Sequence, residues 1–253
     1  MRFTTRTSTD GVIEREFTLD GDTAVTGVLW TPEVPAEGAP LILMGHSGGL
    51  SKRSPGIIAR LDPFVARQGF TVAAIDAPGH GDRPRNARDQ RWVAAMMRAR
   101  EAGEPIGPIV GEYNASLAER AVPEWRAAID ALQDLPGIGR ETPIGFGGMT
   151  LGTAVGILLM AEEPRIGSAS FGSVLVFDAL LEAAKKITVP VRYLLAWDDT
   201  EIPRDTGLAL FDAFASPHKT LHANPGPHSR TPWHEIESET AFHLRNLSPF
   251  TPR

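Results

Sequence analysis

One segment of the chain combines a hydroxyl nucleophile with a backbone that would expose it. Gly148-Met149-Thr150-Leu151-Gly152 directly follows a predicted strand and directly precedes a predicted helix. The glycines let strand and helix approach closely, so the Thr150 side chain is expected at the tip of a sharp turn. The pattern matches the G-x-S-x-G elbow except at its centre, where threonine replaces serine. The segment therefore predicts a hydroxyl group presented for attack on an electrophilic carbon.

The same elbow and an earlier turn offer backbone N–H groups that could stabilise an oxyanion. The amino end of the helix after Thr150 carries free N–H groups and a positive field, and Leu151 is the candidate donor there. Gly45-His46-Ser47-Gly48-Gly49 follows a short apolar run and is a glycine-rich turn that can present further N–H groups. Gly48 is the first candidate donor from this turn and Ser47 is the second.

Two loops in the last quarter of the chain carry the carboxylate and imidazole that such a nucleophile needs. The strand-like run 191–196 leads into Asp198 and Asp199, either of which could orient a histidine. His228 lies on a loop between the last strand-like run and the last predicted helix. An imidazole can take the proton of a hydroxyl nucleophile, and a carboxylate can hold the ring in the required tautomer.

Strand and helix patterns alternate along the chain and predict the scaffold for these groups. Two strand-like runs separated by Asp20-Gly21-Asp22 predict a hairpin, and the later apolar runs suit strands covered on both faces. The alternation implies a mostly parallel sheet with helices on both faces. No repeat or linker divides residues 1–253, so a single domain is expected. The predicted strands are 12–19, 24–30, 41–44, 70–75, 143–147, 168–171, 191–196 and 219–223, and the predicted helices are 55–68, 117–135, 150–163, 177–186, 204–215 and 232–247.

Residues 82–116 interrupt this alternation because they are too many for a simple strand-to-helix connection. Long segments of this kind often have a functional role. The part 89–100 has helical spacing, with Trp92, Met96 and Met97 on one side. We interpret residues 82–116 as a small lid insertion. The alternative is an edge helix packed on the body of the domain.

Five segments in order resemble the α/β-hydrolase superfamily and are most similar to its small esterase and dienelactone-hydrolase-like branch. The resemblance spans about 12–247 and implies an α/β-hydrolase fold with an eight-stranded sheet and a triad of nucleophile, acid and histidine. Position by position, these roles fall on Thr150, Asp199 and His228. The family's acid usually lies three residues before a Val/Ile-Pro pair, here Ile202-Pro203, which favours Asp199 over its neighbour. The five segments are 41–49, 76–81, 148–152, 199–203 and 225–228.

Thr150 departs from the family's serine, and this departure leaves three interpretations open. An elbow residue normally has φ above zero, where a β-branched side chain is an outlier that costs on the order of 1–3 kcal/mol. Thr150 could be a restricted nucleophile in a hydrolase of small carboxylic esters, lactones or thioesters. Alternatively, His228 could perform non-hydrolytic acid–base chemistry, as in a lyase, cyclase or isomerase, while Thr150 only binds the substrate. The third interpretation is a non-catalytic ligand-binding protein.

Several apolar side chains near these segments are candidates for lining a substrate pocket. Trp197 and Trp233 neighbour the acid and histidine loops, and Met149 belongs to the elbow. Trp92 and Met96 belong to the predicted lid. Packing in the core is an equally good account of the aromatic residues.

Composition excludes several classes of protein. The chain has no cysteine, which excludes a thiol nucleophile, disulfides and thiolate metal sites. Its net charge of −6, without a basic stripe, argues against a nucleic-acid partner. The histidines lack the spacing of a metal site. The sequence also lacks a run of about eighteen apolar residues, which a membrane-spanning helix would need. We therefore expect a cytoplasmic protein with a small-molecule substrate, no cofactor and no metal, and the sequence leaves a homodimer open.

Overall fold

The computed structural model describes residues 1–21, 24–34, 38–228 and 230–247. Within these ranges, ten strands form one sheet in the order β1-β3-β4-β6-β5-β7-β8-β9-β10, with β2 paired to β3. Strands β5 to β10 pair in parallel, and the hairpin β3–β4 pairs antiparallel with β6 through β4. The strands are β1 (Arg2–Phe3), β2 (Thr7–Thr9), β3 (Val12–Leu19), β4 (Val25–Pro32), β5 (Leu41–Gly45), β6 (Thr71–Ile75), β7 (Ile144–Gly148), β8 (Ile166–Gly172), β9 (Val191–Ala196) and β10 (Lys219–Asn224).

The architecture confirms the predicted α/β fold with a mostly parallel sheet and an antiparallel hairpin at one edge. The turn of that hairpin includes residues 22 and 23, which lie outside the described residues. The described part of the sheet has ten strands rather than eight because β1 and β2 also pair antiparallel with β3. Strand β2 is wholly exposed and β1 is very short, so neither carries an apolar pattern that reveals it.

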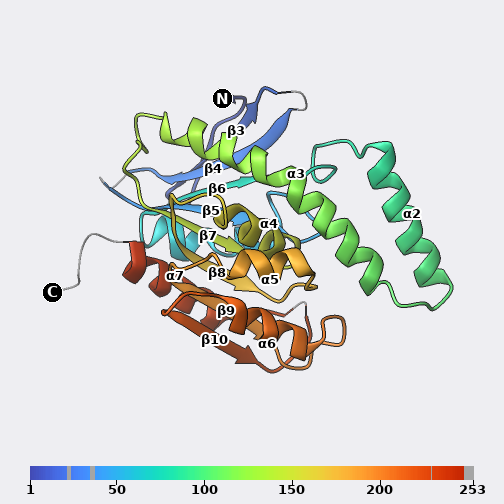
Figure 1. The fold of residues 1–253 in the computed structure, drawn as a ribbon. Coiled ribbons are helices and arrows are strands. Elements are labelled where there is room, and N and C mark those ends of the chain that lie inside the picture. Colours follow the sequence, from blue (N-terminus) through green and yellow to red (C-terminus); the bar gives the residue numbers. More distant parts are fainter. Residues whose placement is uncertain (22–23, 35–37, 229, 248–253) are drawn as a thin grey trace.

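Helices cover both faces of the sheet and bury two separate apolar cores (Figure 1). Leu41 and Leu43 of β5 point into the larger core, whereas Ile42 and Met44 point into the smaller one. This alternation is the two-residue period of a strand buried on both faces. Helices α3 to α6 pack over the larger core, and α1, η1 and α7 pack over the smaller one. The helices are α1 (Pro55–Ile58), the π-helical η1 (Asp62–Ala66), α2 (Ala87–Glu101), α3 (Gly107–Gln133), α4 (Leu151–Met160), α5 (Asp178–Ala184), α6 (Arg204–Ala213) and α7 (Trp233–Leu247).

Two predicted helices differ from the observed ones. The expected helix 55–68 is divided into α1 and η1, and Pro63 lies at the start of η1. Proline lacks an N–H group and clashes with the preceding turn, so a regular α-helix cannot continue through it. Helix α3 begins at Gly107, ten residues before the expected start at Leu117. The predicted lid segment therefore consists of α2, a short connection and the first turns of α3.

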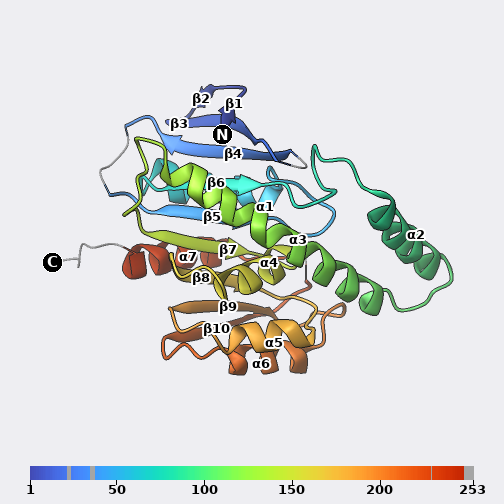
Figure 2. The same ribbon diagram turned by 45° about the horizontal axis from the view of Figure 1, so that its top comes forward.

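Helix α2 and the first half of α3 project beyond the side of the sheet where the parallel strands end (Figures 1 and 2). Asn86 caps α2 by accepting a hydrogen bond from the N–H of Asp89 at 2.8 Å. The Asp89 carboxylate in turn accepts a hydrogen bond from Arg120 of α3 at 2.6 Å. Trp92 stacks on Tyr113, with ring centroids 6.2 Å apart. These contacts hold α2 against α3 at the edge where ligands of open α/β sheets bind.

Candidate active site

The elbow holds Thr150 in a strained backbone conformation. Thr150 joins β7 to α4 with φ of 50° and ψ of −109°. A β-branched residue in this region is an outlier that costs on the order of 1–3 kcal/mol, and such strain concentrates at functional sites. The predicted sharp turn with φ above zero is therefore present in the structure.

Backbone contacts around the elbow explain how the strain is maintained. A Cβ atom added to Gly152 would lie 2.3 Å from the carbonyl oxygen of Gly45, and one added to Gly148 would lie 2.5 Å from the carbonyl carbon of Gly152. The ends of β5, β7 and α4 thus touch through their backbones, and only glycine fits. The Thr153 hydroxyl lies 2.8 Å from the carbonyl oxygens of both Gly148 and Gly172. These contacts fix the turn from three directions.

The Thr150 hydroxyl has no hydrogen-bond partner in the part of the chain that the structure describes, although its oxygen is buried. A buried hydroxyl without a partner costs about 1–3 kcal/mol. The residue as a whole is half-buried and lines the large cavity. Its accessible surface therefore comes from atoms other than the hydroxyl oxygen.

Asp199 and His228 form the acid–imidazole pair. His228 Nδ1 lies 2.8 Å from Asp199 Oδ2, so Nδ1 carries the proton and donates it. The second carboxylate oxygen, Oδ1, accepts the backbone N–H groups of Glu201 at 2.8 Å and Ile202 at 2.9 Å. The Asp199 side chain is 3% exposed, and these bonds fix its orientation. With Nδ1 protonated, His228 Nε2 is free to accept a proton.

The structure distinguishes the two adjacent carboxylates of this loop. Asp198 Oδ2 accepts the backbone N–H of Gly226 at 2.8 Å, and so ties the acid loop to the histidine loop. Its contact with this loop is to the backbone, whereas Asp199 is bonded to the imidazole itself. The two aspartates are adjacent in an irregular turn. Their positions in this turn point one carboxylate at the His228 ring and the other at the backbone of Gly226.

Thr150 and His228 line the same cavity but share no hydrogen bond within the described residues. The cavity has a volume of about 1280 Å³ and lies between the elbow, the acid and histidine loops, α1 and the lid helices. Two of the three residues predicted for the triad thus line one cavity, and Asp199 reaches it only through its bond to His228. The proton relay from Thr150 to His228 is not formed in this conformation.

The predicted oxyanion donors flank Thr150. Leu151 is the first residue of α4, so no carbonyl within the helix can accept its N–H. Gly48 lines the cavity from the turn after β5. Ser47 also lines it, and its hydroxyl donates to the carbonyl oxygen of Met149 at 3.4 Å, joining this turn to the elbow.

His46 and the charges behind the turn hold these donors in place. His46 Nε2 accepts the N–H of Ala77 at 3.0 Å, so Nδ1 carries the proton and donates to the Ser47 carbonyl at 2.8 Å. Burial lowers the pKa of His46 to about 4, which keeps the ring neutral. The backbone N–H of Lys52 donates to Asp76 Oδ1 at 2.8 Å, and its ammonium group donates to Oδ2 at 2.5 Å.

Asp76→Asn should lower the free energy of unfolding at pH 7 by about 3 kcal/mol, because it deprives the buried Lys52 of its buried partner. Burial alone would raise the pKa of Asp76, but hydrogen bonds from Lys52 and Thr26 hold it below its usual value. The stabilisation is therefore present above the unfolded pKa of about 4 and is lost as pH falls through the folded pKa. Urea unfolding at pH 7 and pH 3 measures this difference, which should shrink in acid.

The matched control for this prediction is Asp82→Asn. Asp82 also accepts from Lys52 at 2.5 Å, but its side chain is 69% exposed, so its loss should cost less. An Asp76→Asn variant whose deficit is unchanged between the two pH values would contradict the assignment.

The cavity lining agrees with three of the five predicted pocket residues. Met149, Met96 and Trp233 line the cavity. Trp92 and Trp197 lie elsewhere: Trp92 packs on Tyr113 between the two lid helices, and the Trp197 ring lies 4.0 Å from the Arg204 guanidinium. These two tryptophans therefore do not line the cavity.

Sequence reasoning missed the lining from α1, α3 and the segment after β8. Tyr113 and Asn114 line the cavity because α3 extends further towards its amino end than expected, and Leu117 of the expected helix joins them. The residues 105–108, which precede and begin this helix, also face the cavity. The signal that could have found them is Pro108, since proline near a helix start is common.

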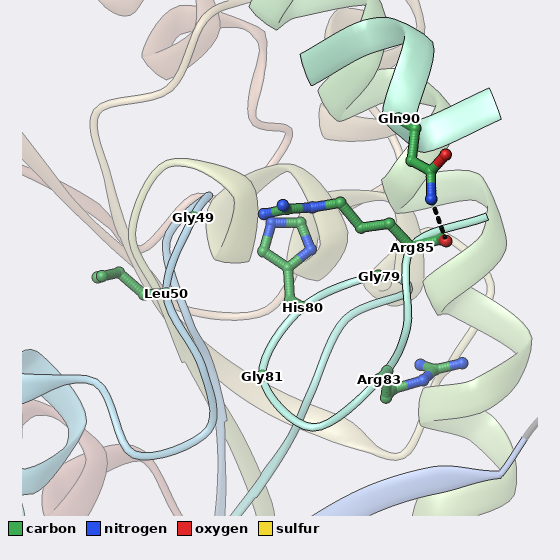
Figure 3. Close-up of a pocket in the computed structure, with 8 residues that line it drawn as sticks. All are labelled: Gly49, Leu50, Gly79, His80, Gly81, Arg83, Arg85 and Gln90. Carbon is green, nitrogen blue, oxygen red and sulfur yellow. Dashed lines mark hydrogen bonds between the residues drawn. The ribbon is translucent and has the colours of Figure 1, made fainter. Parts of the chain in front are cut away.

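A smaller cavity of about 360 Å³ adjoins the large one (Figure 3). Gly49, Leu50 and His80 border both spaces. In Figure 3 the Arg85 side chain extends across the His80 ring. Burial, with a contribution from Arg85, lowers the pKa of His80, whose Nδ1 donates to the Pro78 carbonyl at 3.0 Å. His80 thus belongs to the boundary that the two cavities share, and its lowered pKa favours the neutral form of the ring.

No group of three metal-ligating side chains comes together among residues 1–21, 24–34, 38–228 and 230–247. None of the helices in those ranges is both long enough and apolar enough to cross a bilayer.

The strained elbow, the glycine-rich turn after β5 and the acid–imidazole pair, in this chain order on this sheet, define the class of α/β-hydrolase enzymes. Neither the protein-family models nor the curated proteins contain a match to the sequence. Among solved structures, the PEG-bound complex of a cold-adapted esterase from an Arctic intertidal metagenomic library is 30% identical, with a TM-score of 0.78, over 98% of this chain and all of that one. The chain belongs to the α/β-hydrolase superfamily and is an enzyme of that type.

Two more distant structures share the fold. Est1E from Butyrivibrio proteoclasticus, bound to ferulic acid, is 15% identical over 91% of this chain and 98% of its own, with a TM-score of 0.69. An acetyl xylan esterase from Paenibacillus sp. R4 is 14% identical over 96% of this chain and 87% of its own, with a TM-score of 0.71. These two similarities therefore extend over most of each chain and concern the fold.

Proposed function

We propose that this enzyme hydrolyses small carboxylic esters, lactones or thioesters through an acyl-enzyme formed on Thr150. The observation that carries the proposal is the elbow itself. A β-branched residue is held at φ of 50° with a buried hydroxyl that has no partner in the described chain. Each feature costs about 1–3 kcal/mol, and a structural role for Thr150 would need neither. His228, which is bonded to Asp199, borders the same cavity.

The proposed reaction proceeds in two halves. His228 Nε2 takes the proton of Thr150 Oγ1 as this oxygen attacks the carbonyl carbon, and Asp199 stabilises the imidazolium that forms. The N–H groups of Leu151 and Gly48 stabilise the oxyanion. The tetrahedral intermediate collapses, and His228 returns the proton to the leaving oxygen or sulfur. Water, deprotonated by His228, then attacks the acyl-enzyme and releases the acid, and the proton returns to Thr150.

The first half begins with a rotation of the Thr150 side chain. Because the hydroxyl oxygen is buried while other atoms of the residue face the cavity, attack requires a turn about the Cα–Cβ bond. Rotation of a β-branched side chain is restricted. The methyl group therefore limits both the approach of the acyl group and the rate of the first step.

Thr150 and His228 share no hydrogen bond in the described chain, and this observation supports a second candidate function. In this alternative, His228 moves protons on a bound substrate without a covalent intermediate, as in a lyase, cyclase or isomerase. Thr150 then only donates a hydrogen bond to that substrate. The substrate is a small molecule in both cases.

A fluorophosphonate probe separates the two candidates. The probe should react with Thr150 and add its phosphonyl group to that residue, as measured by intact mass and peptide mapping. His228→Ala should prevent labelling because the hydroxyl loses its base. Asp198→Asn should label at the wild-type rate. A protein that turns over esters yet is labelled on another residue, or not at all, would exclude the acyl-enzyme on Thr150.

A further inference from the structure

We propose that the cavity contains a carboxylate-binding subsite formed by Arg60 and Ser54, so that the preferred substrate is an ester or lactone that also carries a carboxylate. The inference rests on the proposed function and names its substrate class. Both residues line the cavity together with Thr150 and His228. Neither has a role in the proposed reaction steps.

Arg60 is a buried cation with unused hydrogen-bond donors. It is 6% exposed, its Nε donates to Glu239 at 2.7 Å, and its Nη1 donates to the Gly56 carbonyl at 2.7 Å. A guanidinium has five N–H groups, and no further partner for them exists in the part of the chain that is described. The remaining donors are on Nη1 and Nη2, whose paired geometry matches a carboxylate.

Ser54 offers a second donor beside Arg60. It is 6% exposed and occupies the position before α1, yet its hydroxyl does not cap the helix. No hydrogen bond of this hydroxyl exists within the described residues. The Arg60 guanidinium lies against the carbonyl of Gly56, two residues beyond Ser54, so both donors belong to one short segment of the cavity wall. A buried site with two unpaired donors matches a ligand with paired acceptors.

Arg60 is a cation of the cavity wall whose charge is balanced by the buried Glu239, so its selectivity rests on its unused donors. The whole chain has a net charge of −6, whereas the charged side chains that line the cavity, apart from its histidines, are Arg60, Arg100 and Glu201. Burial alone would raise the pKa of Glu239, but Arg60 and Arg192 hold it below its usual value, so Arg60 keeps an ionised partner. That partner occupies only the Nε edge of the guanidinium. The donors that face the cavity remain available to the substrate.

The shape of the cavity assigns the two ends of the substrate. The lid contributes the apolar side chains Met96, Ile106 and Val110 to the cavity wall, together with Arg100 near the end of α2. Arg60 and Ser54 line the wall near α1, where Arg60 pairs with Glu239 of α7. With the ester carbonyl at Thr150, an apolar group would extend under the lid and a carboxylate would extend towards α1.

Kinetics with matched esters test the proposal. Mono-propyl esters of succinic, glutaric and adipic acid would be compared with propyl esters of neutral acids of equal length. We expect the wild type to prefer one of the hemiesters by about 30-fold in kcat/KM, since hydrogen bonds to a charged group are the strong ones. The double variant Arg60→Met/Glu239→Gln removes both members of the ion pair, so it leaves no unpaired buried charge. This variant should lose the preference for hemiesters but should still hydrolyse neutral esters.

Two further variants complete the series. Arg60→Lys keeps the charge but loses the paired donors, and should retain only part of the preference. Arg67→Met removes an exposed arginine of the same segment and should change neither activity. Equal kcat/KM values for hemiesters and neutral esters in the wild type at every length would overturn the proposal, as would a double variant that keeps the preference.

A binding measurement makes the result independent of turnover. N-propyl succinamic, glutaramic and adipamic acids replace the ester with an amide, and their neutral N-propyl alkanamides serve as controls. Calorimetry on the wild type should show tighter binding of one acid, and this preference should vanish in Arg60→Met/Glu239→Gln. If the acid binds preferentially but Thr150 fails to label with the phosphonate, the subsite stands and the acyl-enzyme does not. If labelling succeeds but acids and neutral amides bind equally, the subsite is wrong.

Discussion

Replacing Thr150 with valine should reduce ester hydrolysis by about 10⁴-fold or more in kcat, as expected when a nucleophile that acts together with a base is removed. Valine has the shape of threonine and the same β-branch, so it keeps the backbone strain and loses only the hydroxyl. Steady-state kinetics on a short-chain ester, with thermal unfolding as a check of the fold, measure the effect. Valine also removes an unpaired buried oxygen, so the variant should be at least as stable as the wild type.

Thr150→Ser is the complementary variant and should increase kcat roughly tenfold, because it removes the methyl group and the β-branch from a residue at φ of 50°. Serine rotates more freely and leaves more space for the acyl group. A valine variant that hydrolyses esters at the wild-type rate would refute nucleophilic catalysis by Thr150. A wild type without esterase activity, combined with an active serine variant, would instead support the non-hydrolytic use of His228.

Asp199→Asn should reduce kcat by about 10⁴-fold, the effect expected when the carboxylate behind a catalytic histidine becomes an amide. The Asn side chain can still accept the N–H groups of Glu201 and Ile202, so the loop should keep its shape. It can also donate to His228 Nδ1, which favours the tautomer with the proton on Nε2. In this tautomer Nε2 already carries a proton, so it cannot accept the proton of Thr150. The pH dependence of kcat/KM on the same ester measures the loss of the base.

Asp198→Asn is the matched control, since Asp198 neighbours Asp199 and accepts only a backbone N–H of the histidine loop. An asparagine oxygen can accept the same bond, so kcat should change by less than about threefold. If Asp198→Asn proved the more damaging of the two substitutions, the assignment of the acid would be reversed.

Much of the scaffold was predictable because its signals are local. The run Leu41–Gly45 is apolar at consecutive positions, and the structure buries every residue of it. Strands covered on both faces have this composition. The elbow was equally visible, because glycines on both sides of Thr150 permit contacts that any Cβ would block. The helix start at Gly107 was less visible, since the fold extends α3 by packing Tyr113 against Trp92 of α2.

The details of the site depend on side chains that meet across the fold. Trp197 is adjacent in sequence to the acid loop, yet its ring lies against the Arg204 guanidinium and does not line the cavity. Arg60 carries no motif and gains its position only because Glu239, far along the chain, pairs with it beneath the sheet. Neither outcome has a local signal, because each depends on contacts between segments separated by turns of variable shape.

The order of strands and helices, the glycine elbow and the types of the three candidate catalytic residues are properties of the sequence alone, since periodicity and glycine spacing act over a few residues. The tertiary structure decided that Asp199 rather than Asp198 contacts His228, and that the Thr150 hydroxyl is buried with no hydrogen bond to His228 in the described chain. It also decided that Arg60 and Ser54 face the cavity of the triad. These outcomes follow from packing, because a shift of one residue in a loop or one rotation of a side chain changes which atoms meet.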